Sequence, residues 1–385
     1  MFMSGLVFSV ACTDDDPQAH DDADTSGTDD DGAQAYPFEL PEHFPPPRVP
    51  ADNPLTAAKV ELGRHLFYDP QLSGNGTQSC GDCHFQALAF TDDLVTPEGS
   101  TGEPLVRNSL GLTNSAYTSK LTWANPNLDQ LEQQILIPMF GEFPVELGIT
   151  GHEDEVLARF KQDALYLDLF EAAFPDHSDP VGFDSIVKAL ASFVRVLISG
   201  DSPYDRYRSG DSNAISESAV RGAELFFSEE LECHHCHGSF NFSLATTHTN
   251  TTFTQNAFQN TGLYNIDGAG SYPPGNAGLY EFTFEAGDMG RFRPPTLRNV
   301  AVTGPYMHDG SVETLGEVVD IYAAGGRVIP EDETWPGDGR ANPNKSGLVS
   351  GFELTEQERT DLIAFLHSLT DDTFLTNPEL ADPFG

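Results

Sequence analysis

The chain has 385 residues and a formal net charge of -41, because 60 acidic residues outnumber 19 basic ones. This charge would repel nucleic acid and anionic lipid surfaces, so we expect any protein partner to offer basic or apolar surface. Hydrophobic residues make up 38% of the chain, which suffices for globular cores, while no apolar run is long enough for a transmembrane helix. The length suits two domains of ordinary size.

The first residues predict an export segment followed by a tether. "MFMSGLVFSVAC" is a short apolar run with small residues before Cys12, and it resembles the end of a bacterial lipoprotein signal peptide without the basic start. An artefact at the start of the sequence is the alternative reading. Residues 13–35 are rich in Asp, Thr, Ser, Gly and Ala and hold no large apolar side chain, which predicts a disordered acidic tether.

Helical periodicity and capping residues dominate the rest of the chain. They predict helices over 56–68, 127–139, 153–174, 183–198, 314–324 and 355–369. Residues 248–294 are rich in Gly, Asn, Thr and Pro and show no sustained period, which is typical of long loops. A mainly helical protein with long ordered loops follows, and "LISGDSPYDRYRSGD" is the natural boundary between its halves.

Two passages of the chain resemble each other. "LTAAKVELGRHLFYD" and "SAVRGAELFF" both contain Gly-x-x-Leu-Phe-aromatic, at residues 63–68 and 222–227, and each comes shortly before a pair of cysteines. Chance similarity of two amphipathic helices is one explanation. The shared cysteine motif downstream favours the other, a duplicated helical unit.

The cysteine pairs are followed at once by histidine, as Cys80-Gly-Asp-Cys83-His84 and Cys233-His-His-Cys236-His237. A structural zinc site usually takes both pairs from about 15 to 20 residues of chain, and here they lie about 150 residues apart. A thioredoxin-type redox pair needs no histidine after it. Cys-x-x-Cys-His is the attachment motif of a c-type haem, with two thioether bonds and a proximal histidine ligand.

The sequence therefore predicts two covalent haems, one on Cys80, Cys83 and His84 and one on Cys233, Cys236 and His237. The spacer histidines His234 and His235 receive no ligand role in this interpretation. They are expected at the surface or beside a haem propionate.

With these motifs, "RFRPPTLRNVAVTGPYMHDGSVETLGEVVDIY" resembles the bacterial dihaem cytochrome c peroxidase and MauG superfamily over about residues 54–369. "LTWANP", "PMFGEFPVELG" and "GLYNIDGAG" are most similar to the MbnH family, the MauG-like dihaem enzymes associated with methanobactin. The resemblance implies two cytochrome c-like haem domains, a periplasmic location and one calcium ion between the haems.

Combined with the tether, this resemblance gives a division of the chain into five parts. These are a lipoprotein-type signal remnant (1–12), the acidic tether (13–35), an N-terminal haem c domain with the peroxide-reactive haem (36–200), a C-terminal haem c domain with a His/Tyr-ligated haem (201–372) and a C-terminal tail (373–385).

The sixth ligands distinguish a reactive haem from an electron-transfer haem, because only open iron binds peroxide. Ordinary dihaem peroxidases cap the first haem with a histidine soon after the motif, whereas residues 85–109 hold none. The resemblance thus implies an open first haem. It also aligns Tyr322 with the position of the second haem's sixth ligand, where ordinary peroxidases have methionine and MauG-type enzymes have tyrosine. A core tyrosine is the alternative for Tyr322, and Met307 is the rival ligand.

Further residues match the family's site. Trp123 aligns with a tryptophan between the haems, although an ordinary buried indole is the alternative. Glu146 matches the distal glutamate that moves the peroxide proton, with Glu142 in contention because the loop after Pro138 is longer here. Gln134 corresponds to a pocket glutamine, and a helix-surface role is equally plausible for it.

The expected calcium ligands are oxygen atoms, as a hard cation prefers. They are the side chain of Asn108 and the backbone carbonyls of Thr303 and Pro305. An ordinary turn residue is the alternative for Asn108.

These expectations together describe a periplasmic oxidoreductase, lipid-anchored through Cys12 if the export reading holds. It would use hydrogen peroxide to form a high-valent dihaem state and oxidise a residue on a partner protein, with tryptophan oxidised to kynurenine on an MbnP-like partner. One alternative is a dihaem cytochrome c peroxidase that takes electrons from a small redox protein. The other is a non-enzymatic electron carrier, which an open first haem disfavours.

Overall fold

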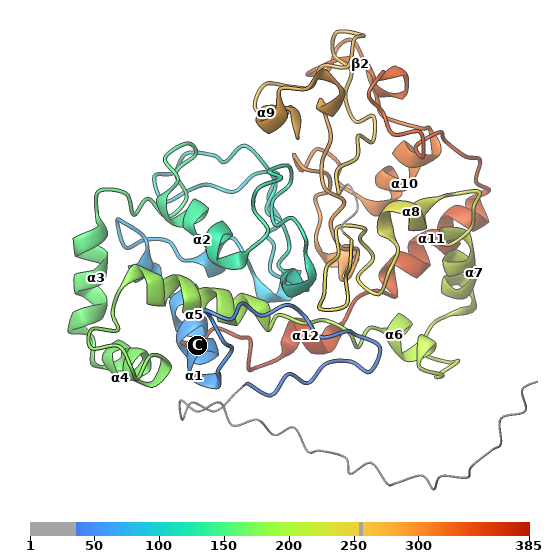
Figure 1. Ribbon diagram of the computed structural model, residues 1–385. Helices are drawn as coiled ribbons and strands as arrows, with labels where there is room; N and C mark the ends of the chain where they lie inside the picture. The colour runs from blue at the N-terminus through green and yellow to red at the C-terminus, as the bar shows by residue number, and fades with distance from the viewer. Residues whose placement is uncertain (1–35, 254–256) are drawn as a thin grey trace, which may run out of the picture.

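The computed structural model describes residues 36–253 and 257–385 (Figure 1). The expected signal remnant with Cys12 and the tether lie outside the described residues. Within the described ranges, every helix is too short or too polar to cross a membrane. The two halves of the chain lie side by side, with α1 to α5 in one and α6 to α11 in the other (Figure 1).

The first half is built around the contact between its first and last helices. Its α-helices are α1 (Ala57–Tyr68), α2 (Leu131–Phe140), α3 (Glu153–Gln162), α4 (Ala164–Ala173) and α5 (Phe183–Arg195). The single helix expected over 153–174 is wrong, because Asp163 adopts an extended backbone and ends α3. Its side chain then accepts a hydrogen bond from the backbone of Leu165 and caps α4.

The second half has short helices separated by long loops, as expected. Its helices are α6 (Pro203–Arg208), α7 (Glu217–Phe226), α8 (Cys233–His237), α9 (Tyr280–Thr283), α10 (Leu315–Ala323) and α11 (Glu356–His367). The last helix, α12 (Asp372–Thr376), follows them in the chain but packs against the first half. Strands β1 (Val328–Ile329) and β2 (Gly337–Asp338) form a small antiparallel pair in a region expected to be loop or helix end. Single 3-10 turns are η1 (Pro70–Leu72), η2 (Cys80–Asp82), η3 (Gln86–Leu88), η4 (Ser115–Tyr117), η5 (Ala286–Asp288), η6 (Val300–Val302) and η7 (Gly339–Ala341).

The two halves repeat one helix-packing contact, as a duplicated unit predicts. In α1, a Cβ atom on Gly63 would lie 2.0 Å from the backbone oxygen of Ala189 in α5. In α7, a Cβ atom on Gly222 would lie 1.9 Å from the backbone oxygen of Asp361 in α11. Each glycine therefore lets two helix backbones approach closely at the same place in the repeated motif.

The aromatic residues after these glycines also correspond. The rings of Phe67 and Phe193 lie 5.2 Å apart in the first half, and those of Phe226 and Phe365 lie 5.0 Å apart in the second. All four are buried in the core of their own half. The repeated Gly-x-x-Leu-Phe motif thus builds the same helix pair twice, each beside its own cysteine motif.

Buried polar contacts join the halves. The Asn299 side chain donates a hydrogen bond to the Ser199 hydroxyl (3.1 Å) and accepts one from the backbone of Asp371 (2.8 Å). The Asp371 carboxylate accepts a further bond from Ser199 (3.0 Å). Since all three residues are buried, these bonds fix the halves relative to each other.

The segment expected as a C-terminal tail, residues 373–385, packs against the first half. It begins inside α12, and Phe374 is buried in the first core beside Phe90. Tyr68 donates a hydrogen bond to the backbone oxygen of Leu380 (2.8 Å). The end of the chain therefore crosses back from the second half to the first (Figure 1).

Candidate functional site

The first cysteine motif forms one tight turn next to α1. The Ser79 and Asp82 side chains and backbones bond reciprocally at the start of this turn, and the backbone N–H of His84 bonds the carbonyl of Cys80 (3.0 Å). The Nδ1 of His84 lies 2.7 Å from the backbone oxygen of Phe90. Burial lowers the pKa of His84, so the ring is neutral, donates through Nδ1 and leaves the Nε2 lone pair for a metal.

The second motif repeats this arrangement in α8. The Nδ1 of His237 lies 3.1 Å from the backbone oxygen of Phe242, and burial lowers the pKa of His237 to about 4. Phe90 and Phe242 both have positive φ, at 61° and 48°, which turns their carbonyls toward the histidines at some conformational cost. Within the described residues, the thiols of Cys80, Cys83, Cys233 and Cys236 form no disulfide.

Glu146 lies near the first cysteine motif, whereas Glu142 is exposed. Burial raises the pKa of Glu146 to about 7. Burial is also the main cause of the raised thiol pKa values of Cys80 and Cys83, and the charge of Glu146 raises both further. Among the described residues, no side chain or backbone group bonds the Glu146 carboxyl group, which leaves it available for proton transfer.

Gln134 of α2 points a polar atom into a place without a protein partner. Its Oε1 is buried and accepts no hydrogen bond from the residues that the structure describes. Because buried carbonyl oxygens are nearly always bonded, such an atom indicates a place where a ligand or water binds. A purely helix-surface role for Gln134 is disfavoured.

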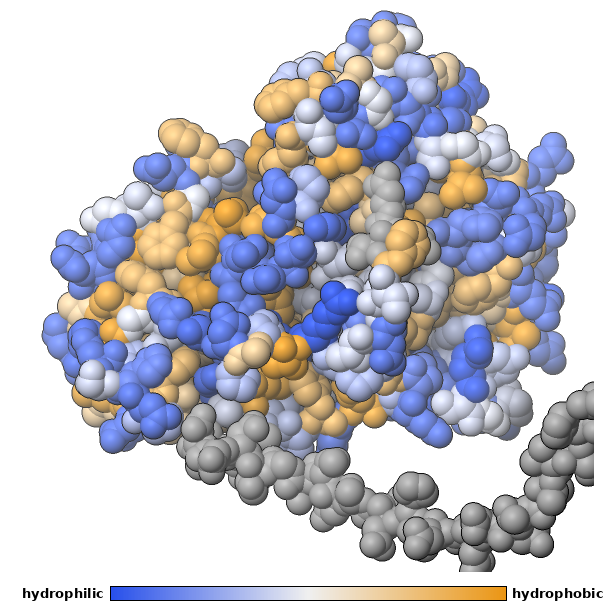
Figure 2. Space-filling view, in the orientation of Figure 1, coloured by the Kyte–Doolittle hydropathy of each residue, from blue (hydrophilic) through white to orange (hydrophobic). Residues whose placement is uncertain are grey.

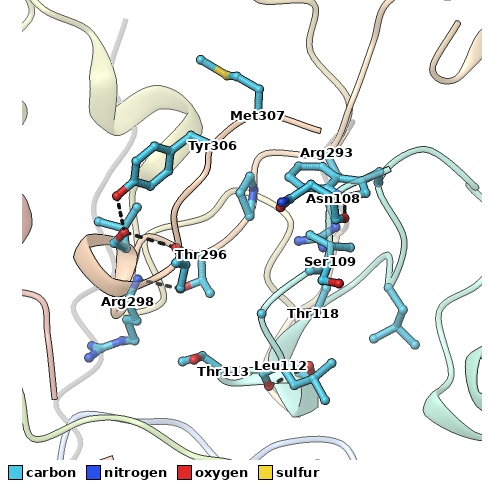
Figure 3. A pocket seen from close by; sticks show the side chains of 18 of the residues that line it. Asn108, Ser109, Leu112, Thr113, Thr118, Arg293, Thr296, Arg298, Tyr306 and Met307 are labelled. Atoms are coloured by element: carbon cyan, nitrogen blue, oxygen red, sulfur yellow. Dashed lines mark hydrogen bonds between the residues drawn. The ribbon is translucent and has the colours of Figure 1, made fainter. Parts of the chain in front are cut away.

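A cavity of about 100 Å³ lies between the halves and brings four of the expected residues together (Figure 3). Trp123, Asn108, Thr303 and Pro305 all line it. The indole Nε1 of Trp123 donates to the backbone oxygen of Asn108 (2.8 Å), and the Asn108 side chain donates to the backbone oxygen of Leu94 (2.9 Å). In the described residues, nothing bonds the side-chain oxygen of Asn108 or the backbone oxygens of Thr303 and Pro305.

Sequence reasoning missed Arg293, which lies beside Asn108 in the cavity (Figure 3). Its Nε donates to the backbone oxygen of Thr122 (3.0 Å), and its side chain is buried. No carboxylate of the described residues pairs with it, and burial lowers its pKa to about 10. An arginine pair in "RFRPPT" of so acidic a chain was the available signal for a buried anion site.

Sequence reasoning also assigned no role in the site to His308 of the "PYMHDG" block. Its ring stacks on that of Phe292 at 3.6 Å, and its buried Nε2 finds no hydrogen bond among the described residues. Burial lowers the pKa of His308 to about 4, so the imidazole is neutral.

Tyr322 comes from α10, whose first turn is closed by reciprocal bonds between Thr314 and Glu317. Burial is the main cause of the raised pKa of Tyr322, and the thiols of Cys236 and Cys233 raise this pKa further. Its hydroxyl thus lies near the second cysteine motif, and it makes no hydrogen bond within the described residues. Met307, the rival ligand, packs against the buried cluster that contains Tyr264, Tyr272 and Ile329.

Three comparisons identify the family. The model of the family "di-haem cytochrome c peroxidase" matches residues 57–213. The methylamine utilization protein MauG of Methylorubrum extorquens is 34% identical, over 89% of this chain and 86% of its own length. The chain belongs to the di-haem cytochrome c peroxidase and MauG family. The cytochrome-c peroxidase IdrP1 of Denitromonas iodatirespirans is 35% identical, over 88% of this chain and 87% of its own.

A solved structure extends the likeness to the whole fold. The crystal structure of a MauG-like protein associated with microbial copper homeostasis is 48% identical and superposes with a TM-score of 0.89. It covers 91% of this chain and 100% of its own. The mainly helical dihaem fold and membership of a family of haem-dependent oxidoreductases that use peroxide follow for this chain.

The residues present fit two haems c, as the family requires. Four free thiols flank two neutral imidazoles, each with Nδ1 held by a backbone carbonyl. Among the described residues, Arg293 offers a buried cation without a carboxylate partner, and Gln134 offers a buried oxygen without a hydrogen bond. These are the groups that a propionate-bearing cofactor and a bound peroxide would satisfy.

Proposed function

We propose that this protein uses hydrogen peroxide to oxidise a residue on a partner protein, converting tryptophan to kynurenine. The observation that carries the proposal is Tyr322, a partly buried tyrosine near the second cysteine motif whose hydroxyl makes no hydrogen bond among the described residues. A phenolate oxygen stabilises oxidised iron better than a thioether does. The absence of histidine from residues 85–109 supports an open first haem, and 48% identity to a MauG-like protein supports the same class.

Each haem would be held by one repeated motif. Cys80 and Cys83 would form its thioether bonds and His84 would ligate the iron, and Cys233, Cys236 and His237 would do so in the second half. Tyr322 would complete the second site. Bound haem iron would supply the redox exchange with peroxide, which no side chain of this chain provides.

Glu146 would act as the base that accepts the peroxide proton and returns it to the departing oxygen. Its carboxyl group has no hydrogen-bond partner among the described residues, and this, with its pKa of about 7, supports the role at neutral pH. Gln134 would orient the peroxide through its unbonded Oε1. Glu142 is exposed and is the weaker candidate.

Trp123 would carry electrons between the two haem sites. Its indole lines the cavity between the halves, and its ring nitrogen is fixed by Asn108. A calcium ion in this cavity would bind the three unbonded oxygens of Asn108, Thr303 and Pro305 and would hold the backbone around the indole.

The partner would be a protein. A small substrate would need a channel that leads to the reactive haem, whereas a protein can give up electrons from a residue docked at the surface. Exposed apolar side chains near the Glu146 loop support a protein contact, with Leu136 at 42%, Ile137 at 46% and Phe143 at 98% exposure. Figure 2 shows apolar surface over the region of α2. An MbnP-like protein encoded nearby, in the periplasm, is the expected partner, with Cys12 as a lipid anchor.

The chemistry balances when two peroxides act on one tryptophan. Four electrons and four protons leave the tryptophan and two water molecules, which gives N-formylkynurenine. These electrons and protons reduce two hydrogen peroxide molecules to four waters, and hydrolysis of N-formylkynurenine then releases formate and leaves kynurenine. Trp123→Phe should leave the spectra of both haems intact and slow partner oxidation at least tenfold, measured by rapid mixing with peroxide. An unchanged rate would remove Trp123 from the electron path.

A cytochrome c peroxidase activity is the second candidate, because a named peroxidase is 35% identical over most of the chain. In that case a small reduced redox protein would supply the electrons, and no residue would be modified. Steady peroxide consumption with reduced cytochrome c or a cupredoxin distinguishes the two functions.

A further inference from the structure

The spacer of the second cysteine motif holds two histidines that the proposed function does not use. The rings of His234 and His235 lie 4.2 Å apart. The Nε2 of His235 lies 3.3 Å from one carboxylate oxygen of Glu229, and the Nε2 of His234 lies 3.6 Å from the other. These three ligand atoms all lie within 4.8 Å of one another.

His234 has no satisfied ring nitrogen. Its Nδ1 is buried without a partner among the described residues, and the 3.6 Å between its Nε2 and Glu229 is too long for a hydrogen bond. A simple surface ion pair accounts for His235 and Glu229 and leaves His234 unexplained. A cation between the two imidazoles and the carboxylate would give all three groups a partner.

The place is open to solvent, so an ion can enter it. The Glu229 side chain is 80% exposed and that of His235 is 38% exposed. Both histidines also line a hollow of about 430 Å³ that includes His248. Water molecules can therefore complete the coordination of an ion held by three protein ligands.

We propose that Glu229, His234 and His235 bind one divalent transition metal ion at the surface beside the second cysteine motif. Two imidazole nitrogens and one carboxylate oxygen suit Cu²⁺ and Zn²⁺, whereas Ca²⁺ prefers oxygen ligands alone. Cu²⁺ binds most tightly in the usual order of divalent metals. Its three ligands differ from the residues proposed to hold the haems, and the site does not depend on the proposed function.

Copper titration of the complete haem-loaded protein, without a polyhistidine tag, tests the site. The titration is done in millimolar Ca²⁺, which occupies the acidic surface groups of this chain of charge -41 and so limits unspecific binding of Cu²⁺ to them. One equivalent of Cu²⁺ should bind, with electron paramagnetic resonance splittings from two nitrogen nuclei. His235→Gln should weaken binding at least tenfold and remove one nitrogen splitting.

His152→Gln is the matched control, because His152 forms an exposed pair with Glu155 (Nδ1 to Oε2, 3.3 Å) without a second imidazole. It should bind Cu²⁺ like the wild type. Since His235 lies within a haem motif, haem content must be checked, and Glu229→Gln outside the motif provides the same test. The proposal is overturned if the wild type binds no stoichiometric Cu²⁺, or if Glu229→Gln binds it with unchanged affinity.

Discussion

The indole of Trp123 donates a 2.8 Å hydrogen bond to the backbone oxygen of Asn108. The side-chain oxygen of the same asparagine, in the cavity between the two halves, accepts no hydrogen bond from the described residues. The residue proposed to carry electrons is therefore fixed by a residue proposed to bind calcium. A change at the proposed ion site should therefore alter the position of the Trp123 indole.

Calcium removal provides the first test. Elemental analysis should find one calcium per wild-type molecule and none in Asn108→Ala, and a chelator should slow partner oxidation in the wild type to the rate of the variant. The reason is that loss of the ion frees the backbone that holds Trp123. A variant that retains calcium and full activity would exclude Asn108 as a ligand.

The two haems should differ in spin state. In the resting oxidised protein, electron paramagnetic resonance should show one high-spin haem open at the sixth position and one low-spin haem ligated by His237 and Tyr322. Tyr322→His should keep the second haem low-spin and raise or shift its reduction potential, because a neutral nitrogen replaces an anionic oxygen. Two low-spin haems in the resting wild type would contradict the open first site.

Tyr306→Phe is the control for that variant. Tyr306 is a nearby tyrosine whose hydroxyl already bonds the backbone oxygen of Val300 (3.1 Å). Removal of this hydroxyl should leave the electron paramagnetic resonance signals of both haems unchanged.

Removal of the proposed base should slow the reaction with peroxide. Glu146→Gln should lower the rate by about 10²- to 10⁴-fold, the usual worth of general acid-base catalysis, without changing either haem spectrum. Glu142→Gln, in the same loop, should react like the wild type. If the defect follows Glu142 instead, the residue assignment in this loop is wrong.

The pKa of Glu146 also predicts a pH dependence. The base must be ionised, so the wild-type rate should rise with pH through about 7, and Glu146→Gln should lose this dependence.

The stability of the folded protein should change with pH in the opposite direction. The folded pKa is raised above its ordinary value of 4.5, so the folded state binds more protons between pH 4.5 and 7, and stability falls as pH rises through that window. Thermal unfolding of wild type and Glu146→Gln across these pH values measures the difference.

The repeated glycines should be intolerant of a methyl group. Gly63→Ala and Gly222→Ala should each lower the free energy of unfolding by about 1–3 kcal/mol or more, because Cβ would overlap a facing backbone oxygen. Gly347→Ala is the control, since no described atom lies within 4 Å of a Cβ there. If Gly63→Ala and Gly222→Ala had the same denaturation midpoint as Gly347→Ala, the close helix contact would be contradicted.

Much of the fold could be predicted from the sequence because the repeated motif carries its own packing. Gly63 and Gly222 mark helix pairs that period and spacing already suggest. The break at Asp163 could not be predicted from periodicity, because the apolar pattern continues through it while the Asp163 backbone leaves the helix. The return of Phe374 to the first core depends on contacts between distant segments, which no local pattern encodes.

The site divides in the same way. The haem motifs are local in sequence and could be read directly, whereas the choice between Glu146 and Glu142 depended on burial, which the lengthened loop obscured. Arg293 could not be recognised because its importance comes from being buried without a carboxylate partner among the described residues. That property appears only when Asn108 and Arg293 are brought to the same cavity by the two halves.

Mass spectrometry of the partner protein after reaction tests the central claim most directly. The partner would be captured by pull-down with the haem-loaded enzyme, mixed with enzyme and peroxide, and digested. Added oxygen or the mass change of kynurenine at one tryptophan is the expected result, absent when enzyme or peroxide is omitted. The account is contradicted if no protein is modified while reduced cytochrome c or a cupredoxin sustains peroxide turnover at about ten per second or faster, an ordinary enzyme rate.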